Sequence, residues 1–498
     1  MMGHWIILPV VLPAILAGIT VLAARHDLIM QRSLSLAGTA GFLAVALWLA
    51  LHADQPEAYR LGNWPAPFGI VLVLDGLSAL MLVLLGTVAL PVLLYVIGTE
   101  WDTRGQHFHA LYLFQLMGLG GAFLTGDAFN LFVFFEVLLI ASYGLMIHGG
   151  GEVRLRAGLQ YVVVNLVGST LFLFALATIY ALTGTLNMAD LAGKWAALPA
   201  GDQALARAAA AMLLLVFAVK GALVPLQFWL PGTYANAPGP VAALFAIMTK
   251  VGAYAVIRLG TLVFDQGPTA GMWQALLIPA ALATLAVGAI GVLGARGLAR
   301  QAAFAAIGSM GVVFLAVGAM TPAATAAALY YMIHSTLAGA ALFLLADLVT
   351  DRRGTDRLDI ARPPMAQGGL IAGLFMAAAI AMAGMPPLSG FLGKMLVLQA
   401  LSAQAALVWT AVLLASFLTI LGFARTGSAL FWKAHASGEE AEAHRAEPLS
   451  FVALGLVLAG LVALTLAAGP VTGWLEQVAT ALHAPEAYIT ANTLGERG

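Results

Sequence analysis

Five side chains that can exchange protons lie in long apolar stretches of the sequence. Glu136, Lys220, Lys250 and Lys394 are flanked by apolar residues on both sides, and His334 lies in a similar run. A charged group in such surroundings is costly unless it is paired or hydrated. A buried lysine tends to lose its proton and a buried glutamate to keep it, and a nearby opposite charge reverses both tendencies. Imidazole titrates near neutral pH, so this set of residues predicts proton transfer between buried groups.

Lys220 lies next to a predicted interruption of its helix. Pro225 and Pro231 follow it, and a proline inside a helix leaves the carbonyl four residues earlier without its hydrogen bond, here that of Gly221. Irregular backbone at membrane depth is tolerated only where it is buried in protein or lines a wet cavity. We therefore expect the helix to end beside this lysine.

Lys394 repeats the arrangement in a second helix. Pro387 precedes it and frees the carbonyl of Ala383. Structural roles are the alternatives to proton transfer: each of these two lysines could cap freed carbonyl groups, and Glu136 could be a carboxylate neutralised by a basic neighbour. His334 could be hydrogen-bonded to an adjacent helix.

Four further positions are interpreted from their place in the apolar runs. Asp75 and Asp127 lie at the ends of runs, where a carboxylate caps a helix or meets interfacial water. Arg258 is predicted to extend its guanidinium to the membrane surface. Lys250 is too far from either surface to do so, and we expect it to line a cavity.

The rest of the chain is dominated by apolar residues. Of its 498 residues, 62% are hydrophobic and 9% are charged. A spanning helix needs about 20 apolar residues, and the absence of strand-like alternation favours helices over a barrel. Candidate spans occur at 5–24, 34–52, 69–97, 109–124, 128–147, 157–182, 207–229, 239–263, 272–294, 301–319, 324–349, 368–398, 405–432 and 450–475. The sequence thus predicts an all-α polytopic membrane protein of about 14 transmembrane helices, forming a single domain over residues 1–498.

Charge and cysteine content exclude several classes of function. The 22 Lys and Arg residues are balanced by 23 Asp and Glu residues, so no basic surface for nucleic acid is expected. Cysteine is absent, which excludes disulfides, Cys-ligated iron–sulfur clusters, c-type haem and thiolate zinc from this chain. We expect no cofactor here, and the sequence assigns no metal ligand.

The basic residues in the loops predict the orientation of the chain. Odd-numbered loops contain Arg25, Arg32, Arg104, Arg154, Arg156, Arg296, Arg300, Arg352, Arg353, Arg357, Arg362, Lys433 and Arg445. Even-numbered loops and the ends contain Arg60, Lys194, Arg207, Arg258 and Arg497. The excess in the first set places the odd loops in the cytoplasm and both termini outside. The acidic segment from Glu439 to Glu447 is then a solvated cytoplasmic loop or a contact with a partner.

The two proline-broken helices are the seventh and the twelfth of the predicted spans. This separation of five fits two five-helix repeats, at about 106–263 and 272–432. An odd number of spans in each repeat makes the second one inverted relative to the first. Inverted repeats with broken helices near the midplane are typical of transporters.

Several stretches together resemble a known family. They are 126–145, 220–243, 249–254, 384–394 and the segment Asp75-Gly-Leu-Ser-Ala-Leu. They are similar to the D subunit of the Mrp-type multisubunit Na+/H+ antiporters. They also resemble, less closely, the antiporter-like proton-pumping subunits of respiratory complex I and membrane-bound hydrogenases.

This resemblance implies a role for each of the five side chains. Glu136 would modulate the charge of Lys220, and Lys250 would link a first half-channel to a second. Lys394 would be the terminal lysine of the relay, and His334 matches a histidine common in the eleventh helix.

One position departs from the family pattern. Many relatives carry a lysine where this sequence has Gly339. The centre of the relay would then depend on water or on His334.

The resemblance implies a secondary transporter rather than an enzyme, in a bacterial inner membrane. The chain would move protons within a multisubunit Na+ or other monovalent cation/H+ antiporter, beside a second large antiporter-like subunit and several small membrane subunits. The alternative is a subunit of a complex I or hydrogenase assembly, which uses the same relay but is driven by electron transfer on partners. A non-transporting scaffold would gain nothing from several costly intramembrane charges.

Overall fold

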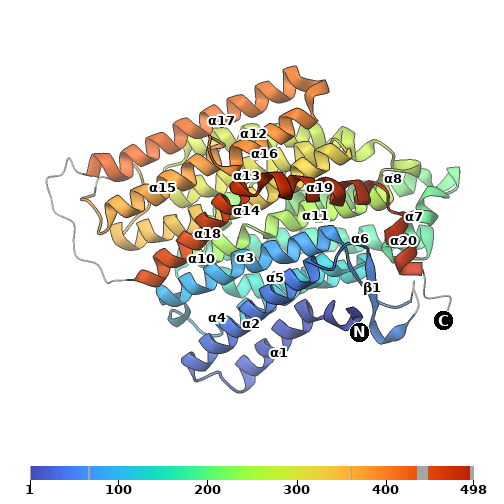
Figure 1. Cartoon of the computed structure of the whole chain (residues 1–498), viewed down its shortest axis with the longest axis horizontal. Helices are drawn as coiled ribbons and strands as arrows, with labels where there is room; N and C mark the ends of the chain where they lie inside the picture. Colours follow the sequence, from blue (N-terminus) through green and yellow to red (C-terminus); the bar gives the residue numbers. More distant parts are fainter. Residues whose placement is uncertain (1, 65–67, 361, 435–446, 494–498) are drawn as a thin grey trace.

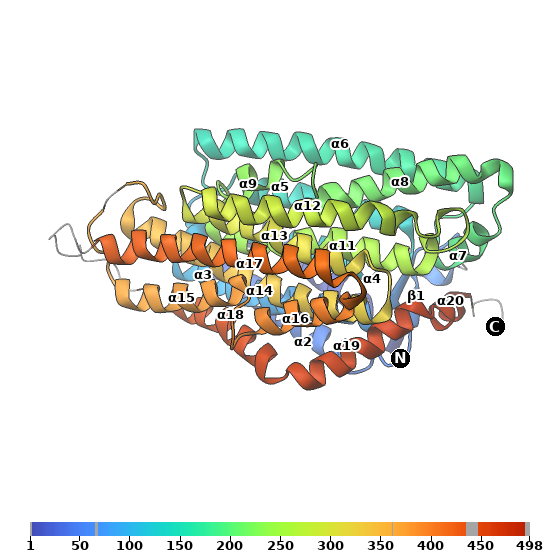
Figure 2. The ribbon, with the colours of Figure 1, turned by 90° about the horizontal axis from the view of Figure 1, so that it is seen from above.

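The apolar stretches of the sequence form helices that run side by side along the long axis of the molecule (Figures 1 and 2). The computed structural model describes residues 2–64, 68–360, 362–434 and 447–493. Within these residues, eleven helical segments are long and apolar enough to cross a membrane, and three shorter apolar helices accompany them. Each of the fourteen overlaps one predicted span. Arg445, Arg497 and the acidic segment up to residue 446 lie outside the described residues.

The first half of the chain contains an N-terminal group and a first helical group. The N-terminal group consists of α1 (Leu8–Leu22), α2 (Leu28–Ala50), β1 (Glu57–Arg60), β2 (Val71–Leu74) and α3 (Gly76–Gly98). The first helical group consists of α4 (Phe108–Leu124), α5 (Ala128–Met146), α6 (Glu152–Thr183), α7 (Met188–Ala196), α8 (Gln203–Lys220), α9 (Trp229–Tyr234), α10 (Gly239–Phe245) and α11 (Met248–Leu259), which continues into a π-helical turn, η5 (Gly260–Phe264).

The second half contains a second helical group and a C-terminal segment. The second group consists of α12 (Met272–Gly294), α13 (Leu298–Val317), α14 (Pro322–Arg353), α15 (Gly368–Ala383), α16 (Ser389–Ala400) and α17 (Ala405–Gly427). The C-terminal segment consists of α18 (Pro448–Leu466), α19 (Ala468–His483) and α20 (Glu486–Thr493). The N- and C-terminal ends lie at the same end of the bundle (Figure 1), as an even number of spans requires.

A short hairpin corrects the expectation that the chain contains no strands. β1 pairs antiparallel with β2, with Glu57 opposite Leu74 and Arg60 opposite Val71. The predicted span 69–97 therefore begins as a strand and becomes a helix only at Gly76. A run of four apolar residues fits a buried strand as well as a helix, so periodicity alone does not separate the two.

The helix interruptions predicted from proline are present. α8 ends at Lys220, and α15 ends at Ala383. A further interruption, at residues 246–247 between α10 and α11, has no proline within it. The last predicted span is also divided, since α18 ends at Leu466 and α19 continues to His483. Whether the two helical groups form inverted repeats remains a prediction.

The centre of the bundle is formed by the segments that carry the candidate site. The window through α10 and α11 is wholly buried, and α14 and α13 are nearly so. By contrast, α17 lies along one edge of the bundle in Figure 1 and α6 along one edge in Figure 2, and both expose large apolar side chains such as Leu166, Phe174 and Leu413. Groups on α11 and α14 are therefore shielded from the surroundings on all sides by protein.

Candidate functional site

Glu136 lies on α5 and contacts the neighbouring helix α6. The hydroxyl of Ser169 donates a hydrogen bond to Oε1 of Glu136. One turn earlier on α6, Oδ1 of Asn165 accepts a hydrogen bond of 2.6 Å from Nζ of Lys220. Residues four apart share one face of a helix, so α6 holds the carboxylate and the ammonium group side by side.

The association of Glu136 with Lys220 is bridged rather than direct. Both residues are described by the structure, and no direct ion pair joins them. Instead, α6 supplies a polar contact to each. Lys220 is 8% exposed, and its Nζ lies 5.6 Å from the ring centre of Phe135, the residue before Glu136. The lysine is the last residue of α8, where Gly221 is the C-cap. A change of charge on either group therefore alters the electrostatic potential at the other, because only one layer of side chains separates them.

Asn165 and Ser169 contact the candidate site but were not predicted from the sequence. Their signal in the sequence is a pair of polar residues four apart within the apolar stretch 157–182. Such a pair marks a polar stripe on one face of a helix. Only the packing of the helices shows which neighbouring helix contacts this polar face.

Lys250 lies close to the interruption between α10 and α11. It is 1% exposed, and its Nζ has no hydrogen bond to any residue that the structure describes. Its helix packs against the end of α8: a Cβ on Gly252 would lie 2.7 Å from the carbonyl oxygen of Phe217 and 2.8 Å from the amide nitrogen of Gly221. Glycine permits this close approach, which brings the helix of Lys250 onto the backbone beside Lys220.

Gly339, the position that departs from the family pattern, lies on α14 opposite the same interruption. A Cβ on Gly339 would lie 3.5 Å from Cβ of Ala246 and would meet no other atom more closely. Because residue 339 has no side chain, the basic groups predicted from the sequence for the centre of the row are Lys250 and His334 alone.

His334, also on α14, is fully buried. Its Nδ1 lies 2.9 Å from Oγ of Ser389, the first residue of α16. A Cβ on Gly390 would lie 2.7 Å from Nε2 of the same ring, so the start of α16 can approach the imidazole only through a glycine. The helix of His334 packs against α16, which carries Lys394, and against α10 and α11, at whose junction Lys250 lies.

Lys394 lies on α16 and caps the end of α15. Its Nζ donates hydrogen bonds of 2.8 Å to the carbonyl of Ala383, the group that Pro387 was expected to free, and of 2.8 Å to Oγ of Ser416 on α17. Gly384 makes room for the lysine, because a Cβ there would lie 2.7 Å from Cδ of Lys394 and 2.9 Å from its Nζ. The structural role considered for this lysine, capping of a freed carbonyl group, is thus present in the structure.

A small cavity adjoins Lys394. Its volume is about 20 Å³, and Ser309, Tyr331 and Thr419 are among the residues that line it. A polar cavity of this size accommodates about one water molecule. A single water could therefore accept a proton from the lysine.

The remaining acidic residues named from the sequence are helix caps. Asp75 is the N-cap of α3, in a reciprocal pair of hydrogen bonds with Ser78, and Asp127 is the N-cap of α5. Burial raises the pKa of Asp127, which lies just before its span, to about 6, against the opposing effect of the backbone amides of Asn130 and Phe129. Both capping predictions are confirmed.

The prediction that Arg258 reaches the membrane surface is wrong. The side chain is 3% exposed and forms two parallel hydrogen bonds with Asp75, from Nη1 to Oδ2 at 2.6 Å and from Nη2 to Oδ1 at 2.7 Å. Such a bidentate pair holds the guanidinium inside the protein. Its partner is 183 residues away in the sequence, so local sequence could not identify it.

The arrangement as a whole is a series of five titratable side chains, of which Lys220, Lys250 and His334 are buried and Glu136 and Lys394 are partly exposed. All but Lys250 form a hydrogen bond with a neighbouring hydroxyl, amide or carbonyl group. Among the described residues, no group of three or more His, Asp or Glu residues is placed to hold a metal ion. Glutamate, lysine and histidine side chains can each accept and donate protons.

Comparison with known proteins gives consistent relatives over nearly the whole chain. Residues 125–422, which include all five titratable groups, match the model of the NADH:quinone oxidoreductase/Mrp antiporter transmembrane family. The chain is 38% identical to the D subunit of a probable K+/H+ antiporter of Rhizobium meliloti, over 97% of this chain and 96% of the relative. It is also 38% identical to the D subunit of a Na+/H+ antiporter of Alkalihalophilus pseudofirmus, over 98% of this chain and 99% of the relative.

Solved structures share the fold. A chain of the Mrp complex from Dietzia sp. superposes with a TM-score of 0.87 at 28% identity, covering 99% of this chain and 100% of that one. A chain of respiratory complex I from Thermus thermophilus superposes with a TM-score of 0.81 at 26% identity, covering 96% of this chain and 99% of that one. The protein is therefore a multi-pass membrane protein that belongs to the NADH:quinone oxidoreductase/Mrp antiporter transmembrane family.

Proposed function

We propose that this chain is the proton-translocating subunit of a multisubunit monovalent cation/H+ antiporter of the Mrp type. The observation that carries the proposal is the row of titratable groups that runs from the partly exposed Glu136 and buried Lys220, past Lys250 and His334, to the partly exposed Lys394. The two relatives at 38% identity are named as D subunits of K+/H+ and Na+/H+ antiporters. Na+ or another monovalent alkali cation is the exchanged ion.

The residues perform proton transfer through changes of charge at close range. A proton that arrives at Lys220 or Lys250 alters the field at Glu136, because α6 holds that carboxylate beside Lys220. In a medium of low dielectric constant, one added charge shifts the proton affinity of its neighbours strongly. The proton then passes through the region of His334 and Ser389 to Lys394, and leaves through the small cavity beside it. Entry of protons down their gradient is coupled to cation extrusion by the assembled complex.

The setting of the chain follows from the same proposal. It lies in a bacterial inner membrane with both termini outside, beside a second large antiporter-like subunit and several small membrane subunits. The multisubunit Mrp complex of Dietzia sp., which contains a chain of the same fold, supports this assembly. The exposed apolar faces of α6 and α17 are available for lipid and for these partners.

Gentle purification of the tagged chain from its native membrane tests the proposal. We expect small hydrophobic partners, no visible absorbance from flavin or iron–sulfur clusters, and cation-dependent proton movement after reconstitution into vesicles. A coloured complex with Cys-rich peripheral subunits would mean that electron transfer drives the same row of residues, as in complex I, and the antiporter proposal would fail.

The contact between Asn165 and Lys220 should matter for turnover. We expect Asn165→Ala to slow cation-dependent proton movement by about tenfold, because Nζ of Lys220 loses the acceptor that positions it. Thr170→Ala on the same helix is the matched control, since its exposed hydroxyl bonds only to the carbonyl of Leu166 one turn earlier. A rate for Asn165→Ala equal to that of the control would show that Asn165 does not position the lysine.

A further inference from the structure

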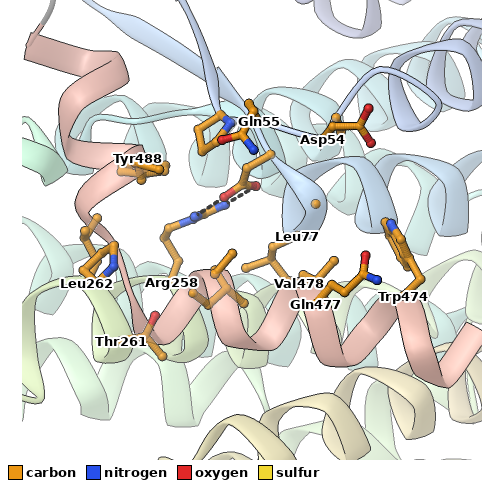
Figure 3. A pocket seen from close by; sticks show the side chains of 18 residues that line it. Asp54, Gln55, Leu77, Arg258, Thr261, Leu262, Trp474, Gln477, Val478 and Tyr488 are labelled. Carbon is orange, nitrogen blue, oxygen red and sulfur yellow. Dashed lines mark hydrogen bonds and ion pairs between the residues drawn. The ribbon is translucent and has the colours of Figure 1, made fainter.

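A cavity of about 300 Å³ lies at the end of the bundle that carries both termini, apart from the row of five groups. The start of α3, the end of α11 with η5, and helices α19 and α20 enclose it (Figure 3). The bidentate pair of Arg258 and Asp75 lies in its middle, with Gln477 and Trp474 along one side and the ring of Tyr488 at another.

Polar side chains form part of the cavity wall, among them Gln55, Thr261 and Gln477. Nε of Arg258 and the hydroxyl of Tyr488 have no hydrogen-bond partner among the described residues, although the two side chains are only 3% and 5% exposed. Unsatisfied buried donors are costly, and a polar cavity of this volume has room for several water molecules. We therefore expect this cavity to contain water.

Helix α11 extends from the cavity wall to Lys250. Lys250, Tyr254 and Arg258 follow one another at intervals of four residues on α11, so they share a face and span about 12 Å. The guanidinium of Arg258 lies 5.7 Å from the ring centre of Tyr254. The phenol of Tyr254 donates a hydrogen bond of 2.7 Å to the carbonyl of Phe123 on α4, which fixes this ring between the cavity and the lysine.

We propose that this cavity is the hydrated access route for protons between Lys250 and the membrane face that carries the termini, and that the Asp75–Arg258 pair is its gate. The inference rests on the proposed function and adds a route and two residues to it. With the pair formed, the guanidinium closes the path along α11. When the pair separates, the guanidinium retains its contact with the ring of Tyr488, 4.9 Å away, and the carboxylate of Asp75 faces the water.

Cysteine labelling tests the hydrated route. The chain contains no cysteine, so an introduced thiol reports on one position. Thr261→Cys places the thiol in the cavity wall, and Ala255→Cys places it on the same helical stretch at a fully buried position. The assembled complex is treated, in sealed vesicles with the termini outward, with a cationic, membrane-impermeant methanethiosulfonate.

We expect Thr261→Cys to be labelled and to lose most of its cation-dependent proton movement as a result, and Ala255→Cys to remain unlabelled. Failure of Thr261→Cys to react, or reaction without an effect on proton movement, overturns the route. If the unlabelled Thr261→Cys complex and the unmodified complex both move no protons, the proposed function fails, whereas the labelling pattern still reports on the cavity.

The gate is tested with a thiol at the far end of the route. Lys250→Cys is combined with Asp75→Asn and Arg258→Gln together, because removing one partner alone leaves an unpaired buried charge. We expect its labelling rate to rise by about tenfold, since the bidentate pair no longer closes the path. The matched control removes the surface pair of Lys194 and Asp190 and leaves the rate unchanged. An equal rate in the gate variant and the control would overturn the gate.

Discussion

Lys220→Ala is expected to lower cation-dependent proton movement at least about 100-fold, the range over which a positioned acid–base group contributes to a rate. Nζ of Lys220 donates to Oδ1 of Asn165, and the alanine side chain can neither carry a proton nor supply a charge there. Glu136 also loses the amine that α6 holds beside it. The measurement is dye-reported proton movement in vesicles that contain the assembled complex. Glu136→Ala should cause a comparable loss, because it removes the other half of the same unit.

A lysine outside the row provides the control for this prediction. Lys194 lies on the surface helix α7, where it pairs with Asp190 one turn away. Exposed pairs of this kind contribute little, so Lys194→Ala should leave proton movement unchanged. Co-purification of the partner subunits with each variant separates loss of transfer from loss of assembly. Antiport at the normal rate in both Lys220→Ala and Glu136→Ala would contradict the mechanism.

What the sequence could predict is set by the range of the interactions involved. The ends of α8 and α15 were predictable because proline acts on the backbone within four residues of itself. The contact of Lys394 with the carbonyl of Ala383 follows from the same local effect. The caps formed by Asp75 and Asp127 are local as well, since each carboxylate accepts from an amide three residues ahead.

The features that the sequence missed depend on which helices pack together. Arg258 has an aliphatic stem long enough to reach the surface, and only the placement of α3 beside α11 brings Asp75 to it instead. In the sequence, Asn165 is simply a polar residue in an apolar helix. Its contact with Lys220 depends on the packing of the end of α8 against α6. The interruption before Lys250 contains no proline, so nothing in the sequence marks it. The row of titratable residues could thus be found by type, but its connections could not.

Lys394→Ala should abolish cation-dependent proton movement if protons leave through the second half of the chain. Nζ of Lys394 faces both the carbonyl of Ala383 and the hydroxyl of Ser416, and the cavity beside it has room for about one water molecule. Alanine removes the group that hands the proton to this water. The position of the Lys394 amine should matter as much as its presence. A substitution at Gly384 tests this, because it displaces the lysine without replacing it.

Gly384→Ala is expected to slow turnover by about tenfold while leaving Lys394 in the chain. The new Cβ would lie 2.7 Å from Cδ of Lys394, and the backbone at this residue has a φ of +77°, which alanine rarely adopts. The lysine must therefore move away from Ala383 and Ser416. Gly373→Ala, in the helix that Gly384 caps and with nothing within 4 Å of its Cβ, is the control that keeps the normal rate. If Lys394→Ala also turns over normally in an assembled complex, protons leave the row before α16, and the exit must be sought along α11 instead.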